Sequence, residues 1–74
     1  MSRKLKFDDF RGGQIVIPTE QGLKGLRLKR ERYRIIKLDR VDYTIFLFGL
    51  KSGEGRWVPP EWITDYGFYR RIEE

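Results

Sequence analysis

Seven lysines and arginines lie within one short segment, and this cluster is the residue pattern best suited to binding chemistry. They are Lys24, Arg27, Lys29, Arg30, Arg32, Arg34 and Lys37. Only Glu31 opposes them, so the segment carries +6 while the whole chain carries +5. Concentrated positive charge attracts polyanions such as nucleic acid, an anionic membrane surface or an acidic protein. The alternative is a solvated hairpin whose charges serve only solubility.

The spacing of three arginines favours a phosphate backbone as the polyanion. Arg30, Arg32 and Arg34 alternate, so an extended strand would place them on one face, about 6.6 Å apart. Such a row is compatible with tracking phosphates, and an exposed Trp57 would stack on bases or insert between them. We therefore predict binding of DNA or RNA through Lys24, Arg27, Lys29, Arg30, Arg32, Arg34, Lys37 and Trp57. The competing interpretation pairs the arginines with nearby carboxylates and packs Trp57 in the core.

Residue types that commonly carry out catalysis are missing. The chain has no histidine and no cysteine, which excludes imidazole acid–base chemistry, thiolate nucleophiles and zinc sites of the Cys/His type. The carboxylate pairs Asp8/Asp9 and Asp39/Asp42 suit surface and turn positions. Gly53-Glu54-Gly55 lacks the lysine and the following helix of a phosphate-binding loop. We expect a protein without enzymatic activity, cofactor or metal.

The elements that position these residues must belong to one small domain. Seventy-four residues form a single domain, and eleven aromatic residues supply its core. We expect residues 1–13 to form an N-terminal arm, with Leu5, Phe7 and Phe10 packing on a domain of residues 14–74. No apolar run has the length of a signal peptide or of a membrane span of about 20 residues. This predicts a soluble cytoplasmic protein with no membrane partner.

Short β-branched and aromatic runs separated by glycine and proline predict five strands. They cover residues 14–17, 30–38, 43–50, 56–58 and 66–72. Residues 19–24 are predicted to be a loop, 51–55 a hairpin turn, and 60–63 a single 3-10 turn. Short strands without a long amphipathic helix, in a chain of this size, predict a small all-β barrel of five strands.

The strand at 43–50 is apolar on both faces, which requires cover on both. One face belongs to the core, and the N-terminal arm or a partner must cover the other. This supports a second hypothesis, in which the chain binds another protein or a second copy of itself. The interface would then include Phe46, Phe48, Trp62 and Tyr66.

The stretch Gly55-Arg56-Trp57-Val58-Pro59-Pro60-Glu61-Trp62-Ile63 resembles the end of a Src-homology-3 domain. In that family a strand leads into a proline, a 3-10 turn bearing an aromatic residue, and a closing strand. Trp62 stands where the family has its aromatic residue, and Pro59 or Pro60 where it has its proline. The resemblance spans residues 14–66 and extends to small phage and bacterial proteins of this fold. It implies a Src-homology-3-like barrel, and it specifies fold better than function.

The chain departs from the peptide-binding members of that family. Those open with an Ala-Leu-Tyr-Asp-Tyr type of motif and carry an acidic loop, whereas this chain has its basic segment near the position of that loop. Basic barrels of similar architecture, such as ribosomal, KOW-type and archaeal chromatin domains, bind nucleic acid. The resemblance therefore implies a binding module, with nucleic acid as the first candidate ligand and an accessory protein–protein role as the alternative.

Overall fold

The computed structural model describes residues 6–24 and 28–66, which form one antiparallel sheet. In chain order the elements are η1 (Phe7–Asp9), β1 (Ile15–Pro18), α1 (Glu20–Leu23), β2 (Tyr33–Asp39), β3 (Thr44–Gly49), β4 (Gly55–Val58), η3 (Pro60–Trp62) and β5 (Ile63–Asp65). The strand order is β4-β3-β2-β1-β5. The predicted all-β class, five strands and 3-10 turn near residues 60–63 are confirmed.

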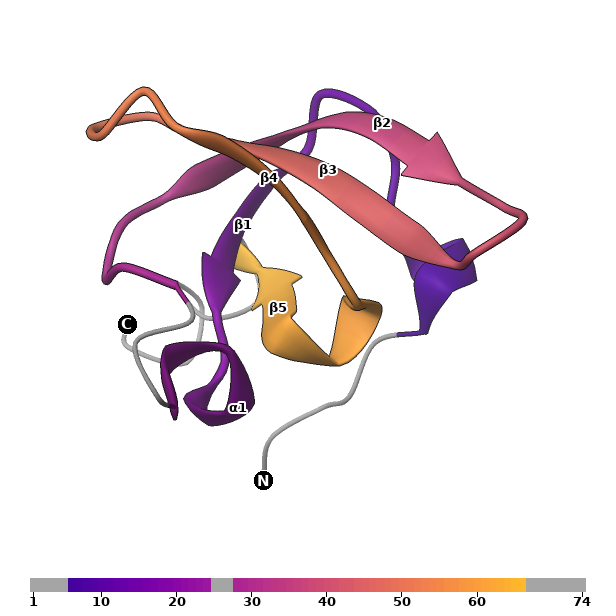
Figure 1. The fold of residues 1–74 in the computed structure, drawn as a ribbon, viewed down its shortest axis with the longest axis horizontal. Helices are drawn as coiled ribbons and strands as arrows, with labels where there is room; N and C mark the ends of the chain where they lie inside the picture. The colour runs from indigo at the N-terminus through magenta and orange to yellow at the C-terminus, as the bar shows by residue number, and fades with distance from the viewer. Residues whose placement is uncertain (1–5, 25–27, 67–74) are drawn as a thin grey trace.

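The sheet bends over its own core but does not close. In Figure 1, β2, β3 and β4 cross the top of the molecule while β1 and β5 lie beneath them. Within the described residues β4 pairs only with β3, and β5 only with β1. The five strands therefore form a bent sheet that is not closed into a barrel. Pro59 and Pro60 stand between the two edge strands and have no N–H to donate to a ladder, and β5 has only three residues.

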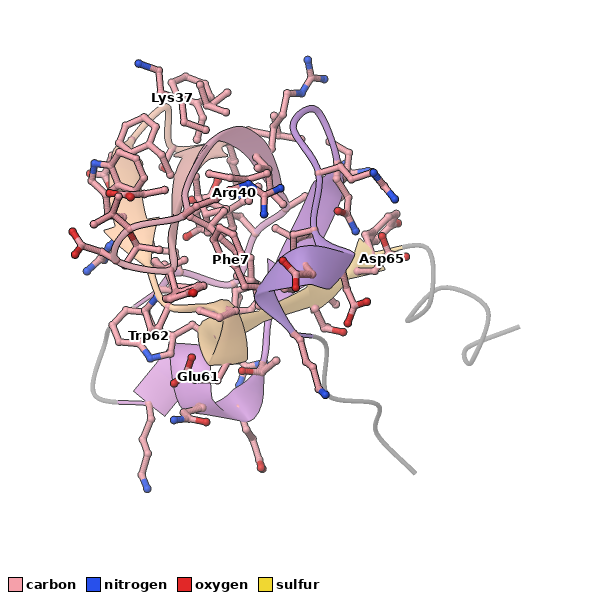
Figure 2. The ribbon with its side chains drawn as sticks, turned by 90° about the vertical axis from the view of Figure 1, so that its right-hand side faces the viewer. Phe7, Lys37, Arg40, Glu61, Trp62 and Asp65 are labelled. Carbon is pink, nitrogen blue, oxygen red and sulfur yellow. The ribbon has the colours of Figure 1, made fainter. Side chains whose placement is uncertain are left out.

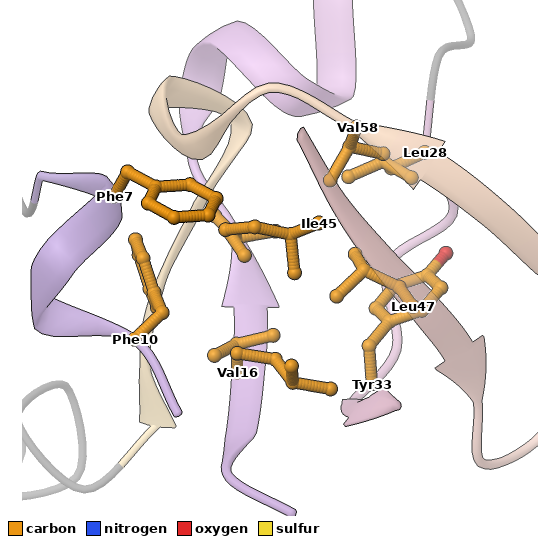
Figure 3. Close-up of a cluster of buried hydrophobic side chains, with 10 residues drawn as sticks. Phe7, Phe10, Val16, Leu28, Tyr33, Ile45, Leu47 and Val58 are labelled. Carbon is orange, nitrogen blue, oxygen red and sulfur yellow. The ribbon is translucent and has the colours of Figure 1, made fainter. Parts of the chain in front are cut away.

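The core lies between the two halves of the bent sheet. Figure 3 shows Phe7 and Phe10 at one side of it, Tyr33 and Leu47 toward the other, and Val16 and Ile45 between them. Its members are Phe7, Phe10, Val16, Leu28, Tyr33, Ile35, Ile45, Leu47, Val58 and Ile63, with Leu38 and Trp62 packed against them. Burying each such side chain contributes about 1.5–3 kcal/mol. This cluster stabilises a chain that has no disulfide.

The segment before β1 packs on the inner side of the sheet. Phe7 and Phe10 both belong to the core, and the Phe7 ring meets Tyr43 edge-on at 5.5 Å. The Arg40 guanidinium, in the turn after β2, lies 5.7 Å from the centre of the Phe7 ring and 3.5 Å from Asp8 Oδ1. Leu5 lies outside the described residues. Phe7 and Phe10 therefore do not cover the outer side of β3, for which the N-terminal arm and a partner were the two predicted alternatives.

Three predicted elements differ from the observed ones. β2 begins at Tyr33 rather than at residue 30, because the chain doubles back when the Glu31 N–H donates to the Lys29 carbonyl at 2.9 Å. The expected loop at 19–24 contains α1, a single helical turn capped by the Thr19 side chain, which accepts from the Gly22 N–H. The last strand directly follows η3 at residues 63–65, and of the predicted range 66–72 only residue 66 is described.

Candidate nucleic-acid interface

The outer side of β2, β3 and β4 collects basic and aromatic side chains on one surface. Along β3, Ile45 and Leu47 point into the core and are fully buried. Because successive side chains of a strand point to opposite faces, Phe46 and Phe48 point outward. The ladders pair Phe46 with Lys37 on one side and Trp57 on the other, and pair Phe48 with Arg34 and Gly55. Cross-strand partners share a face. We refer to Arg34, Ile36, Lys37, Phe46, Phe48 and Trp57 as the outer face.

A bulge in β2 puts both cations on this face. The ladder to β3 is regular up to Ile35, skips Ile36 and resumes at Lys37. Strict alternation would turn Lys37 toward the core, opposite to Arg34. The extra residue reverses the alternation, so that Lys37 emerges beside Arg34 and Leu38 turns inward against the core. Figure 2 shows Lys37 at the top of the molecule, far from Phe7.

The three aromatic side chains of the outer face, Phe46, Phe48 and Trp57, are referred to below as the ridge. The rings of Phe46 and Trp57 are 5.1 Å apart between centroids and tilted by 53°. Phe46 also lies over Gly55, which has no side chain to obstruct it. Phe48 and Trp57 are exposed to 42% and 48%. Exposed rings grouped in this way are a typical sign of a binding surface.

The electrostatic character of the outer face is positive. Arg34 and Lys37 are exposed, and neither takes part in either ion pair found in residues 6–24 and 28–66. The carboxylate closest along the strands is Asp39, at the end of β2. Its Oδ1 accepts from the backbone N–H groups of Val41 and Asp42 at 2.8 and 3.3 Å. The two cations are therefore available to an anionic ligand.

The other cations predicted for the site are dispersed. Lys29 Nζ is 3.2 Å from Glu54 Oε1 in an exposed ion pair, and the Arg32 guanidinium lies 5.5 Å from the centre of the Tyr66 ring. Arg30 is exposed but precedes β2, and Lys24 follows α1. Arg27 lies outside the described residues. Of the predicted alternating arginines, only Arg34 is in a strand, so the regular arginine row does not form.

Glu31, predicted to moderate the basic segment, instead organises the turn between β3 and β4. Its Oε1 accepts from the backbone N–H groups of Lys51 and Ser52 at 2.8 and 2.9 Å. Burial acts to raise the pKa of Glu31, but hydrogen bonds from Ser52 and Lys51 and the charge of Lys29 outweigh it, and the pKa lies below its ordinary value. This carboxylate therefore fixes the hairpin that holds Trp57 beside Phe46.

The residues of the alternative protein interface separate into different places. Phe46 and Phe48 lie on the outer face, whereas Trp62 is half-buried against the core and its carbonyl accepts from the Thr19 N–H at 2.8 Å. Figure 2 places Trp62 low in the molecule, away from Lys37. Tyr66 is half-buried beneath Arg32. The structure thus unites part of each predicted set on a single face.

Two contributors to the outer face were missed from the sequence. Gly55 was interpreted only as a turn residue. The short hairpin after β3 is the signal that could have predicted its role, because a short turn there places Trp57 opposite Phe46 and Gly55 opposite Phe48. Ile36 was taken as an ordinary strand residue. No local signal marks it as the bulge, because Ile35 and Ile36 are identical and only the packing of Lys37 and Leu38 decides which of them is unpaired.

The described residues were also searched for metal-binding groups and for membrane-spanning helices. Within the described ranges, no group of three or more acidic side chains could hold a metal ion. No helix in the same ranges is both long and apolar enough to cross a membrane. Comparison with known proteins gave no matching family model, no matching curated protein and no matching solved structure.

Proposed function

We propose that this protein is a non-enzymatic module that binds nucleic acid through its outer face. The observation that carries the proposal is the placing of Arg34 and Lys37 beside Phe46, Phe48 and Trp57. Cations that neutralise phosphates supply most of the affinity for nucleic acid, and exposed rings supply stacking on bases. Both chemistries are present side by side, and neither cation is taken up by a carboxylate of the described residues.

We also propose that the fold is a Src-homology-3-like variant with an open sheet. In support, β4 runs into Pro59, then into the 3-10 turn η3 that carries Trp62, and then into the last strand, β5. This is the succession of elements on which the resemblance rests. The fold supports a binding role only by analogy, and the outer face is what favours nucleic acid.

The test is retention and binding on DNA across a range of salt concentrations. We expect the chain to be retained on immobilised DNA at low salt, and the logarithm of its binding constant to fall linearly with the logarithm of salt concentration. Replacing Arg34 or Lys37 with glutamine removes one phosphate contact and should reduce that slope by about 1. No retention at low salt would contradict the proposal.

Arg40→Gln is the matched control for these variants. It removes the same charge from an exposed arginine, but one that lies on Phe7 and Asp8, away from the outer face. General electrostatic attraction responds equally to all three substitutions, whereas a localised site responds only to those at Arg34 and Lys37. Equal slopes for all three variants would mean that net charge alone drives binding.

The exposed rings also favour a second candidate, in which the outer face binds another protein or a second copy of the chain. Phe48, Trp57 and Ile36 are each exposed to more than 40%, and such apolar surface is typical of interfaces. β4 is an edge strand that could pair with another chain. Sedimentation velocity tests the version in which the chain binds a second copy of itself. A wild-type dimer that becomes a monomer in Trp57→Glu supports this candidate. A wild-type monomer excludes self-association.

A further inference from the structure

We infer that the nucleic acid bound by the outer face is single-stranded. This inference rests on the proposed function and specifies its ligand. The reason lies in how the outer face divides its chemistry: its cations come only from β2, and its rings only from β3 and β4. A ligand that fits must present its negative charge along one flank and its stacking surfaces along the other.

A single strand has this asymmetry and a duplex does not. In a single strand one phosphate backbone runs along one side, and unpaired bases extend from it with their faces open. In a duplex two backbones border each groove, so a protein that enters a groove meets phosphates on both flanks. Beyond Trp57 the sheet ends, because β4 is its edge strand. Among residues 6–24 and 28–66, no further strand carries cations toward a second backbone.

The spacing of the residues fits one backbone with splayed bases. Neighbouring strands are about 4.8 Å apart, so Arg34 and Lys37 lie one strand from the phenylalanines and two strands from Trp57. Trp57 is the ladder partner of Phe46, so Phe48 is offset from Trp57 by two residues along the strands, about 6.8 Å, which is twice the rise of about 3.4 Å per nucleotide in a stacked strand. A base therefore has room to lie against an exposed ring without overlapping its neighbour.

The chemistry of the ridge also disfavours reading a duplex. Sequence in a groove is read by donors and acceptors on the base edges, and the three rings of the ridge carry one polar group between them, the indole N–H of Trp57. Ring faces match the faces of bases, which a duplex conceals within its stack. Phe48 and Trp57, the two exposed rings, are therefore assigned as the stacking positions.

The experiment compares one oligonucleotide of about 12 nucleotides, within the usual site size, in three forms: single-stranded DNA, the same sequence as RNA, and the blunt DNA duplex. Binding to the full chain is followed by fluorescence anisotropy at one salt concentration. We expect both single strands to bind at least tenfold more tightly than the duplex. Trp57→Ala and Phe48→Ala should each weaken single-strand binding about 5- to 150-fold, the value of one stacked base.

Two controls keep the outcome specific. Val41→Ala trims an apolar residue that is 86% exposed but lies outside the outer face, and it should leave affinity unchanged. Trp57→Phe keeps a ring and should restore most of the affinity lost in Trp57→Ala. Circular dichroism verifies the fold of each variant. Unchanged single-strand affinity in Trp57→Ala and Phe48→Ala would overturn the stacking assignment.

The forms of the ligand separate failure of the inference from failure of the proposed function. Equal or tighter binding of the duplex would overturn the single-strand inference while leaving nucleic-acid binding in place. No binding of any of the three forms at low salt would remove both. If the single strands bind more tightly than the duplex, which supports the inference, a difference between RNA and DNA identifies the sugar that the face accepts.

Discussion

The ring of Phe46 rests on the bare backbone of Gly55, and a Cβ added at residue 55 would come within 2.6 Å of Cζ of that ring. Because Cζ is the far end of a side chain that can turn, Gly55→Ala should displace the ring at low cost. We expect a loss of less than about 1 kcal/mol in the free energy of unfolding, within the range of surface substitutions. Since Phe46 contacts Trp57, the emission of the tryptophans should shift. An unchanged spectrum would contradict the contact.

A second glycine, Gly22, is packed against rigid backbone instead. Its added Cβ would collide with the carbonyl oxygen of Trp62, which already accepts from the Thr19 N–H. Neither group can turn away without separating α1 from η3. We therefore expect Gly22→Ala to lower the free energy of unfolding by about 1–3 kcal/mol, as for an overpacked core. Gly12→Ala, which meets nothing within 4 Å, is the matched control. Equal losses in the two variants would contradict this packing.

Glu31 should stabilise the turn between β3 and β4. Glu31→Gln keeps the size of the side chain but removes the charge that strengthens its bonds to the N–H groups of Lys51 and Ser52. Charge-assisted bonds are worth more than neutral ones, and solvent reduces the difference here. We expect a loss of about 1 kcal/mol in chemical denaturation at neutral pH. Glu20→Gln in α1, where the carboxylate makes none of these bonds, should cost less.

The pH dependence of that loss follows from the direction of the pKa shift. The pKa of Glu31 is lower in the folded chain than its ordinary value, so its contribution is present above the ordinary glutamate value of about 4.3 and disappears as the pH falls through the folded value. The difference in the free energy of unfolding between wild type and Glu31→Gln should therefore shrink as the pH falls below the ordinary glutamate value of about 4.3. A difference that stays constant from neutral to strongly acidic pH would contradict the assigned bonds.

Tyr33 should respond at the opposite end of the pH range. Its hydroxyl accepts from the Lys29 N–H at 3.0 Å and donates to the Lys29 carbonyl at 3.3 Å. Burial raises the pKa of Tyr33 above its ordinary value, so its stabilising effect is complete below about pH 10 and is lost as the pH rises through the folded value. In ultraviolet titration one tyrosine should ionise late, and Tyr33→Phe should remove that late step. If the late ionisation step persists in Tyr33→Phe, the raised pKa belongs to another tyrosine.

Much of the fold could be predicted because local composition determines it. The alternation of Ile45 and Leu47 with Phe46 and Phe48 specifies both the strand and its two faces, and Pro59 ends β4 because it cannot donate a hydrogen bond. Closure of the barrel was not predictable in this way. It depends on whether two edge strands meet, which no local pattern encodes, and the short β5 leaves them apart.

The candidate site was predicted in its parts but not in its assembly. Cation clustering identified Arg34 and Lys37, and apolar patterning identified Phe46 and Phe48, yet these were assigned to two competing functions. Only the register between β2 and β3 shows that they share a face, and that register depends on the bulge at Ile36. Lys29 and Arg32 lie elsewhere, beside Glu54 and Tyr66, and these contacts join residues too distant in sequence for a local pattern to indicate them.

The bulge itself can be tested by deleting Ile36. Removal would leave Arg34, Ile35, Lys37 and Leu38 in regular alternation and opposite the same β3 partners as before. Ile36 is 45% exposed, so little core is lost, and we expect a cost of about 1 kcal/mol in the free energy of unfolding. Deleting Leu47 from the regular strand β3 is the control, since it would shift the outward phenylalanines by one position and should unfold the chain. Unfolding on loss of Ile36 would instead mean that the added twist of the bulge is needed to bend the sheet over its core.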